Sequence, residues 1–155
     1  MRLALAIMTP AVVLSIGMLA YSFADDRQQD DESQIEQIIK SGTAAFNSGD
    51  FQTATKVLHP TEYTTFGSSP QGELAQIPRA AIVELLEAIT PALGQVKASE
   101  PIDLKVQVHG DAAVATYLRK TQMGEKRWAT IRMTGVYFRI DGEWLLVHEH
   151  QSMLM

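Results

Sequence analysis

The sequence contains no cysteine among its 155 residues, so no disulfide holds the chain and its fold must rest on a packed core. It has no cluster of lysine and arginine, and its formal net charge is −5, so we expect neither nucleic acid nor an anionic membrane surface as a partner. No internal repeat is present. The composition, 46% hydrophobic and 20% charged, is that of one ordinary globular domain.

The first 24 residues differ from the rest of the chain. Residues 3–24 are almost wholly apolar, follow the single charge of Arg2, and end in Ser-Phe-Ala before the polar run that begins at Asp25. This layout predicts a signal peptide over residues 1–24 and export to the periplasm or medium after cleavage near Ala24. The alternative is an uncleaved membrane anchor, because about 20 apolar residues can span a bilayer. Pro10 and Gly17 favour cleavage.

The remaining chain begins with a polar leader, residues 25–32, which we expect to be disordered. One domain over residues 33–155 follows. A capping box at Ser33 and Glu36 begins the first predicted helix, and the glycine of Asn47-Ser48-Gly49 ends it. Asp50 caps a second helix that ends at His59-Pro60, and a third begins near Pro78.

The second half of the chain is predicted to be strand. Apolar and polar residues alternate over 102–109, and further strands are predicted over 112–123, 127–140 and 143–152. An earlier segment, residues 62–66, also has strand composition. Asp141-Gly142 is a strong hairpin signal between the last two strands. Helices followed by an antiparallel meander indicate an α+β domain with helices on one face of a curved sheet. Both sheet faces carry apolar residues, so we expect the second face to meet another subunit.

Three segments carry a resemblance to a known family: the corner FNSGDFQTATKVLHP, the strand TYLRKTQ and the ending RIDGEWLLVHEHQS. Over residues 33–153 the chain resembles the nuclear transport factor 2-like (SnoaL-like) proteins, most of all the association domain of calcium/calmodulin-dependent protein kinase II. The resemblance implies a cone-shaped α+β fold, with three N-terminal helices packed on a curved antiparallel sheet, a conical pocket and dimers. The family includes ketosteroid isomerases, epoxide hydrolases, polyketide cyclases and scaffolds without chemistry, so the fold does not settle function.

Arg119 is the first candidate ligand-binding residue. It aligns with an arginine that the association domain points into its pocket, and it shares a strand face with Tyr117 and Thr121. A buried guanidinium needs an anion to offset its desolvation, which favours a carboxylate ligand. The alternative is that Arg119 is a charge at the solvent edge of the sheet. Where the association domain has a second pocket arginine, this chain has Gly135; Arg132 belongs to the opposite face of a regular strand.

His148 and His150 are the other candidates. In a regular strand they share a face with Trp144 and Leu146, which the resemblance places toward the pocket. They could act as acid and base or simply form hydrogen bonds in the pocket wall. The other two histidines show no spacing that would complete a metal site, so we predict neither a metal nor a cofactor.

Motifs of the catalytic relatives are missing. Glu62 and Tyr63 lie in the region of an isomerase's catalytic groups but match no motif, and the acids of an epoxide hydrolase set are replaced by Thr121 and Thr134. We therefore predict an exported, dimeric or larger SnoaL-like domain whose pocket binds a small, partly apolar, carboxylate-bearing molecule. The predicted ligand-binding residues are Tyr117, Arg119, Tyr137, His148 and His150. The alternatives are an enzyme of the ketosteroid isomerase or polyketide cyclase type using histidine acid–base chemistry, and a purely structural oligomerisation domain.

Overall fold

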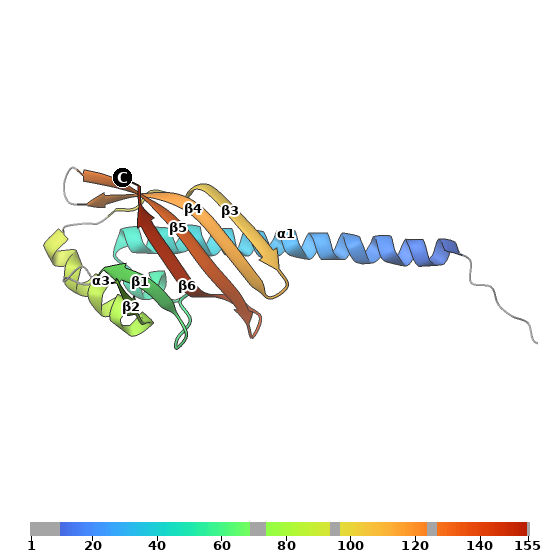
Figure 1. The fold of residues 1–155 in the computed structure, drawn as a ribbon, viewed down its shortest axis with the longest axis horizontal. Helices are drawn as coiled ribbons and strands as arrows, with labels where there is room; N and C mark the ends of the chain where they lie inside the picture. The colour runs from blue at the N-terminus through green and yellow to red at the C-terminus, as the bar shows by residue number, and fades with distance from the viewer. Residues whose placement is uncertain (1–9, 69–73, 94–96, 124–126, 155) are drawn as a thin grey trace, which may run out of the picture.

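The computed structural model describes residues 10–68, 74–93, 97–123 and 127–154, and these form the helices and strands in Figure 1. The helices are α1 (Pro10–Ser48), α2 (Phe51–Ala54) and α3 (Arg79–Leu93). The strands are β1 (Thr64–Ser68), β2 (Leu74–Ile77), β3 (Ile102–His109), β4 (Ala112–Met123), β5 (Arg127–Ile140) and β6 (Glu143–Met153).

The strands of the described residues form one six-stranded sheet in the order β2-β1-β6-β5-β4-β3. The meander from β3 to β6 is antiparallel, as predicted, and the α+β class is confirmed. The sheet differs from the predicted antiparallel arrangement at one pair, where β1 runs parallel to β6. Strand β2, which was not predicted, pairs with β1 at the sheet edge.

Helix α1 crosses one face of the sheet, here called the inner face, and its amino-terminal part extends beyond the sheet edge (Figure 1). Ile35 and Ile39 lie one helical turn apart and are almost completely buried against the sheet. They join a core that includes Leu58 from the loop after α2, together with Ala115 of β4 and Met133 of β5. This packing leaves the opposite, outer face of the meander uncovered.

The leader predicted to be disordered is instead part of α1, which also continues through the predicted capping box. Asp31, in the middle of that leader, is 3% exposed and forms an ion pair with Arg139 of β5. The indole Nε1 of Trp144 donates to the same carboxylate at 3.4 Å, and Arg139 lies over the Trp144 ring at 4.5 Å. The polar run was misread because one of its carboxylates faces inward and is neutralised there.

The signal peptide predicted for residues 1–24 stays a prediction, and residues 1–9 lie outside the described residues. Within the described part of the chain, no helix combines the length and the apolar character needed to cross a membrane.

The Asn47–Asp50 corner joins the helical layer to the sheet. The side-chain amide of Asn47 donates to the Ala98 carbonyl at 2.8 Å, and its oxygen accepts from the Ala98 amide at 2.7 Å. Asp50 caps α2 by accepting from the Thr53 amide at 3.0 Å, as predicted. Helix α2 is shorter than predicted, because Leu58 leaves it to form a parallel bridge with Leu146 of β6.

The predicted bounds of β4 and β5 are confirmed, and β6 extends one residue past its predicted end. Asp141 and Gly142 both have positive φ, 52° and 85°, which is the combination that a type I′ hairpin turn requires.

Gly135, in the middle of β5, has a neighbour where a side chain would be. A Cβ built there would lie 2.9 Å from Tyr137 Cε2 and 3.0 Å from Leu146 Cδ1. The ring of Tyr137 therefore covers the glycine, and the space of the missing side chain is filled by the protein itself.

We predict that Gly135→Ala lowers the free energy of unfolding by about 1–3 kcal/mol, because the added methyl displaces a buried tyrosine ring. Gly42→Ala is the matched control. Its Cβ would meet only the Ala54 carbonyl, at 3.9 Å, inside α1, so alanine should stabilise by up to about 1 kcal/mol through helix propensity. Urea denaturation measures both values. Equal effects of the two substitutions would contradict the packing described for Gly135.

Candidate functional site

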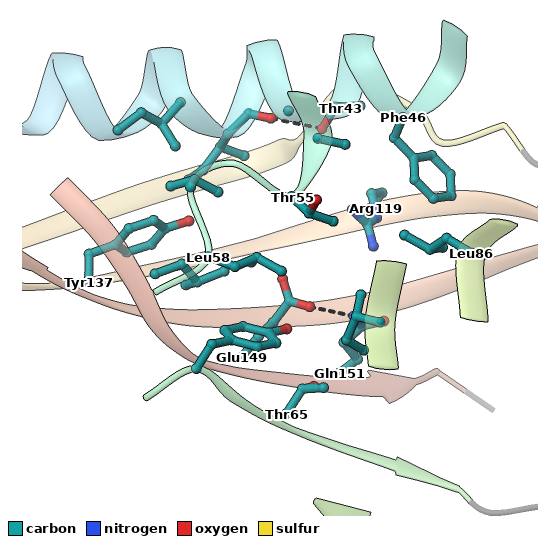
Figure 2. Close-up of a pocket in the computed structure, with 18 of the residues that line it drawn as sticks. Thr43, Phe46, Thr55, Leu58, Thr65, Leu86, Arg119, Tyr137, Glu149 and Gln151 are labelled. Carbon is teal, nitrogen blue, oxygen red and sulfur yellow. Dashed lines mark hydrogen bonds between the residues drawn. The ribbon is translucent and has the colours of Figure 1, made fainter. Parts of the chain in front are cut away.

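A cavity of about 280 Å³ lies between the helices and the inner face of the sheet (Figure 2). Helices α1 and α3 and the segment around α2 supply its apolar lining: Ile38, Ile39, Phe46, Ala54, Val57, Leu58, Ile82, Leu85 and Leu86. The strands and the segment that leads into β1 supply most of its polar lining: Tyr63, Thr65, Tyr117, Arg119, Tyr137, Glu149 and Gln151. The cavity is thus apolar on the helix side and polar on the sheet side.

Three predicted site residues, Tyr117, Arg119 and Tyr137, line this cavity. They come from the inner-face positions of β4 and β5, and Figure 2 shows Arg119 and Tyr137 directed into the space below α1. Whether they bind a ligand stays a prediction. The Nε atom of Arg119 is buried and has no hydrogen-bond partner in the described residues. The Thr121 hydroxyl, two residues further along β4, is also buried without a partner.

The inward orientation predicted for His148 and His150 was wrong. His148 pairs with Val136, and Tyr137 pairs with Leu146, so the register skips Val147. This extra residue is a β-bulge, and it reverses which side chains face inward for the rest of β6. Neither histidine lines the cavity.

Glu149 and Gln151 take the inward positions instead. They lie opposite Gly135 and Met133, both inner-face residues of β5, and directly opposed residues share a face. Figure 2 shows the Glu149 carboxylate in the cavity, where Gln151 Nε2 donates to its Oε1 atom at 2.5 Å. Sequence reasoning missed these residues, although the run Leu145-Leu146-Val147 interrupts the alternation that a regular strand would show.

The histidines lie outside the cavity, and two of them have hydrogen-bond partners there. His148 Nδ1 lies 2.8 Å from the Thr64 hydroxyl, across the parallel β1–β6 pair. His150 is exposed and lies opposite Thr134. His59 Nδ1 accepts from the Glu62 amide at 2.9 Å. Among the described residues, no three histidine, aspartate or glutamate side chains are grouped so that they could hold a metal ion.

One of the two arginines and one of the two isomerase candidates line the cavity, and the other member of each pair does not. Arg132 lies opposite Leu118, is exposed and does not line the cavity, so Arg119 alone of this pair faces inward. Tyr63, which matches no motif, does line the cavity, whereas Glu62 is exposed.

Three of the four tyrosines of the chain, Tyr63, Tyr117 and Tyr137, surround the cavity and are buried. Burial, and next the negative charge of Glu149, raises the pKa of Tyr117 to about 12. The same two causes raise the pKa of Tyr63, and burial followed by the neighbouring Tyr117 raises the pKa of Tyr137. Arg119 opposes each shift. The phenols stay protonated at neutral pH and can donate hydrogen bonds to a ligand.

A model of the SnoaL-like domain family matches residues 35–155, which is most of the chain and includes β1 to β6 and the cavity. The chain belongs to the SnoaL-like domain family. Its expected nuclear transport factor 2-like fold is confirmed by solved structures.

Three solved structures illustrate this likeness. This SnoaL-like domain is 23% identical to an NTF2-like protein of unknown function from Pseudomonas putida, with a TM-score of 0.69 over 80% of this chain and 87% of that one. It is 25% identical to the CaMKII hub of S. rosetta, with a TM-score of 0.66 over 79% and 96% of the two chains. It is 24% identical to the association domain of C. elegans CaMKII, with a TM-score of 0.64 over 82% and 98%.

We predict that this SnoaL-like domain loses stability above pH 10, in step with its buried tyrosines. Below that pH the phenols are neutral in both the folded and the unfolded protein, so the free energy of unfolding keeps its full value. Between pH 10 and 12 the unfolded chain ionises first, so at pH 11 a phenol with the raised pKa of Tyr117 costs about 1 kcal/mol of stability.

Urea denaturation at pH 8 and 11 measures this loss, and tyrosinate absorbance measures the ionisation itself. Tyr117→Phe keeps the ring and removes the hydroxyl, so its stability should fall less steeply with pH than that of the wild type. Identical pH dependence of the two proteins would show that Tyr117 is not the group responsible.

Proposed function

We propose that this SnoaL-like domain is an exported module that binds a small, partly apolar, carboxylate-bearing molecule in its cavity, and that it acts as a dimer or larger oligomer. The observation that supports ligand binding best is Arg119, whose Nε atom is buried in the cavity wall without a hydrogen-bond partner. A buried donor left unpaired costs about 1–3 kcal/mol, and more when it is charged. A ligand carboxylate would offset that cost.

The dimensions of the cavity support a small ligand. Its volume of about 280 Å³ lies just below the range of about 300–1,000 Å³ that is usual for drug-sized ligands. The apolar side chains of α1 and α3 would cover the carbon skeleton, and the buried tyrosines could donate to further oxygens. An open cavity of this kind also argues against the purely structural alternative, in which side chains would fill the cone.

If the protein is an enzyme, its catalytic residues are not the two histidines expected from the sequence. Histidine chemistry in the cavity has no support, because His148 and His150 lie outside it. A carboxylate beside protonated phenols is, however, an arrangement of a base and oxyanion donors, so a reaction in this cavity would use Glu149 with Tyr117 or Tyr137.

Oligomerisation is supported by the outer face of the sheet and by the structural neighbours. Phe138 and Trp128 are 43% and 56% exposed on β5. Partly buried Val136 lies on the same strand, and partly buried Val114 and Leu118 lie on the neighbouring β4. Exposed apolar patches of this kind mark association surfaces. The likeness to a CaMKII hub and an association domain supports self-association.

We predict that small carboxylates raise the melting temperature of the wild-type domain and not that of Arg119→Ala. A ligand at about 100 times its dissociation constant adds about 2.7 kcal/mol, or several degrees. Arg132→Ala, on the outer face, is the matched control and should keep the full shift.

Without ligand, Arg119→Ala should not be less stable than the wild type, because it removes an unpaired buried donor. Differential scanning fluorimetry gives the shifts, and NMR of the recovered ligand shows whether it has been chemically changed, which would favour the enzyme. No shift with wild type, or equal shifts in wild type and Arg119→Ala, would refute the binding proposal.

We also predict that bacterially expressed protein lacks residues 1–24 and assembles through the outer face. Denaturing mass spectrometry measures the mass of the cleaved chain, and native mass spectrometry measures how many chains form the assembly. Phe138→Asp should reduce the assembly to monomers, since it places a charge in the apolar patch, whereas Thr61→Asp, in an exposed turn before β1, should not. An uncleaved chain would contradict the export proposal. A wild-type protein that is monomeric would contradict the oligomer proposal.

A further inference from the structure

Glu149 gives the cavity a second charge that a carboxylate ligand does not explain. Its carboxylate lies in the same cavity as Arg119, yet its side-chain partner among the described residues is the neutral amide of Gln151, on Oε1. No described cation lies within ion-pair distance of Glu149. A carboxylate that faces a cavity without a cationic partner favours a cationic group on whatever fills that cavity.

Arg119 and Glu149 are too far apart to neutralise each other. In the sheet order their strands, β4 and β6, are separated by β5. Arg119 lies opposite Ile131, and Glu149 lies opposite Gly135, four positions along the same strand. In a flat sheet the two backbones would be about 10 Å apart across the strands and about 13 Å apart along them. The curvature of the sheet and the two long side chains shorten this span (Figure 1), but no ion pair joins Arg119 and Glu149.

The charges nevertheless act on the same groups. Glu149 raises and Arg119 lowers the pKa of the same three side chains, Tyr63, Tyr117 and Tyr137. The polar wall of the cavity therefore carries one positive and one negative side chain, and protonated phenols lie near both. A ligand with a carboxylate alone would meet Arg119 favourably, but its negative charge would also be repelled by Glu149.

We infer that the cavity selects a small zwitterion, whose carboxylate meets Arg119 and whose protonated amine meets Glu149 across a short apolar linker. This inference rests on the proposed ligand-binding function and narrows its ligand class. The linker lies against the apolar side chains of α1 and α3, and Gln151 orients the Glu149 carboxylate toward the amine.

The test uses three probes with the same carbon chain: 6-aminohexanoate, hexanoate, which lacks the amine, and hexylamine, which lacks the carboxylate. Isothermal titration calorimetry at pH 7 should give wild-type protein at least tenfold tighter binding of 6-aminohexanoate than of either partial probe. Amino acids with shorter and longer linkers locate the optimum span between the two charges.

Substitutions at Glu149 then separate charge from shape. Glu149→Gln should remove the preference for 6-aminohexanoate over hexanoate, whereas Glu143→Gln, an exposed glutamate at the start of β6, should keep it. Glu149→Lys should shift the preference to adipate, the dicarboxylate of the same length. A gain of adipate binding cannot result from failure to fold.

The outcomes for the two proposals differ. Hexanoate binding that equals 6-aminohexanoate binding and is unchanged in Glu149→Gln would overturn the zwitterion inference and leave the carboxylate site intact. Failure of every carboxylate in the series to bind wild-type protein would overturn the proposed function, and the zwitterion inference with it.

Discussion

The β-bulge at Val147 is the constraint on which the cavity depends. Before it, Trp144 and Leu146 pack into the core, and after it, Glu149 and Gln151 face the cavity. Without the extra residue, the strand would turn two imidazoles inward and expose the carboxylate. One unpaired residue in the strand pairing thus decides which side chains line the polar wall of the cavity. Without it, the wall would carry imidazoles, which titrate near neutral pH. With it, the wall carries one positive and one negative side chain.

Two polar contacts hold the helical layer against this wall. Asn47 pairs with the backbone of Ala98 as a neighbouring strand would, and Asp31 joins α1 to Arg139 and Trp144 near the hairpin. The contacts lie in different parts of α1, with the apolar Ile35 and Ile39 between them. Since hydrophobic packing is not directional, these polar contacts help to fix how α1 lies over the sheet.

Sequence patterns predicted well the features that depend on local chemistry. The bounds of β4 and β5, the Asp50 cap and the Asp141-Gly142 turn follow from alternation, capping and backbone preferences, and each is confirmed. Side-chain orientation after Val147 could not be derived in the same way, because the uninterrupted apolar run Trp144–Val147 fits either face of a strand. The helical leader was also missed, since the neutralisation of Asp31 depends on Arg139, far away in the sequence.

The position of Asp31 sets a limit on how far proteases can trim the folded protein. A signal peptidase acting near Ala24 would leave Asp31 about two helical turns inside the new amino terminus, with its ion pair to Arg139 intact. Removal of a few more residues, past Asp31, would leave the Arg139 guanidinium against Trp144. Its remaining acidic partner among the described residues would be the exposed Asp111. Under the proposed cleavage, the six residues between Ala24 and Asp31 would separate the new amino terminus from the carboxylate that pairs with Arg139.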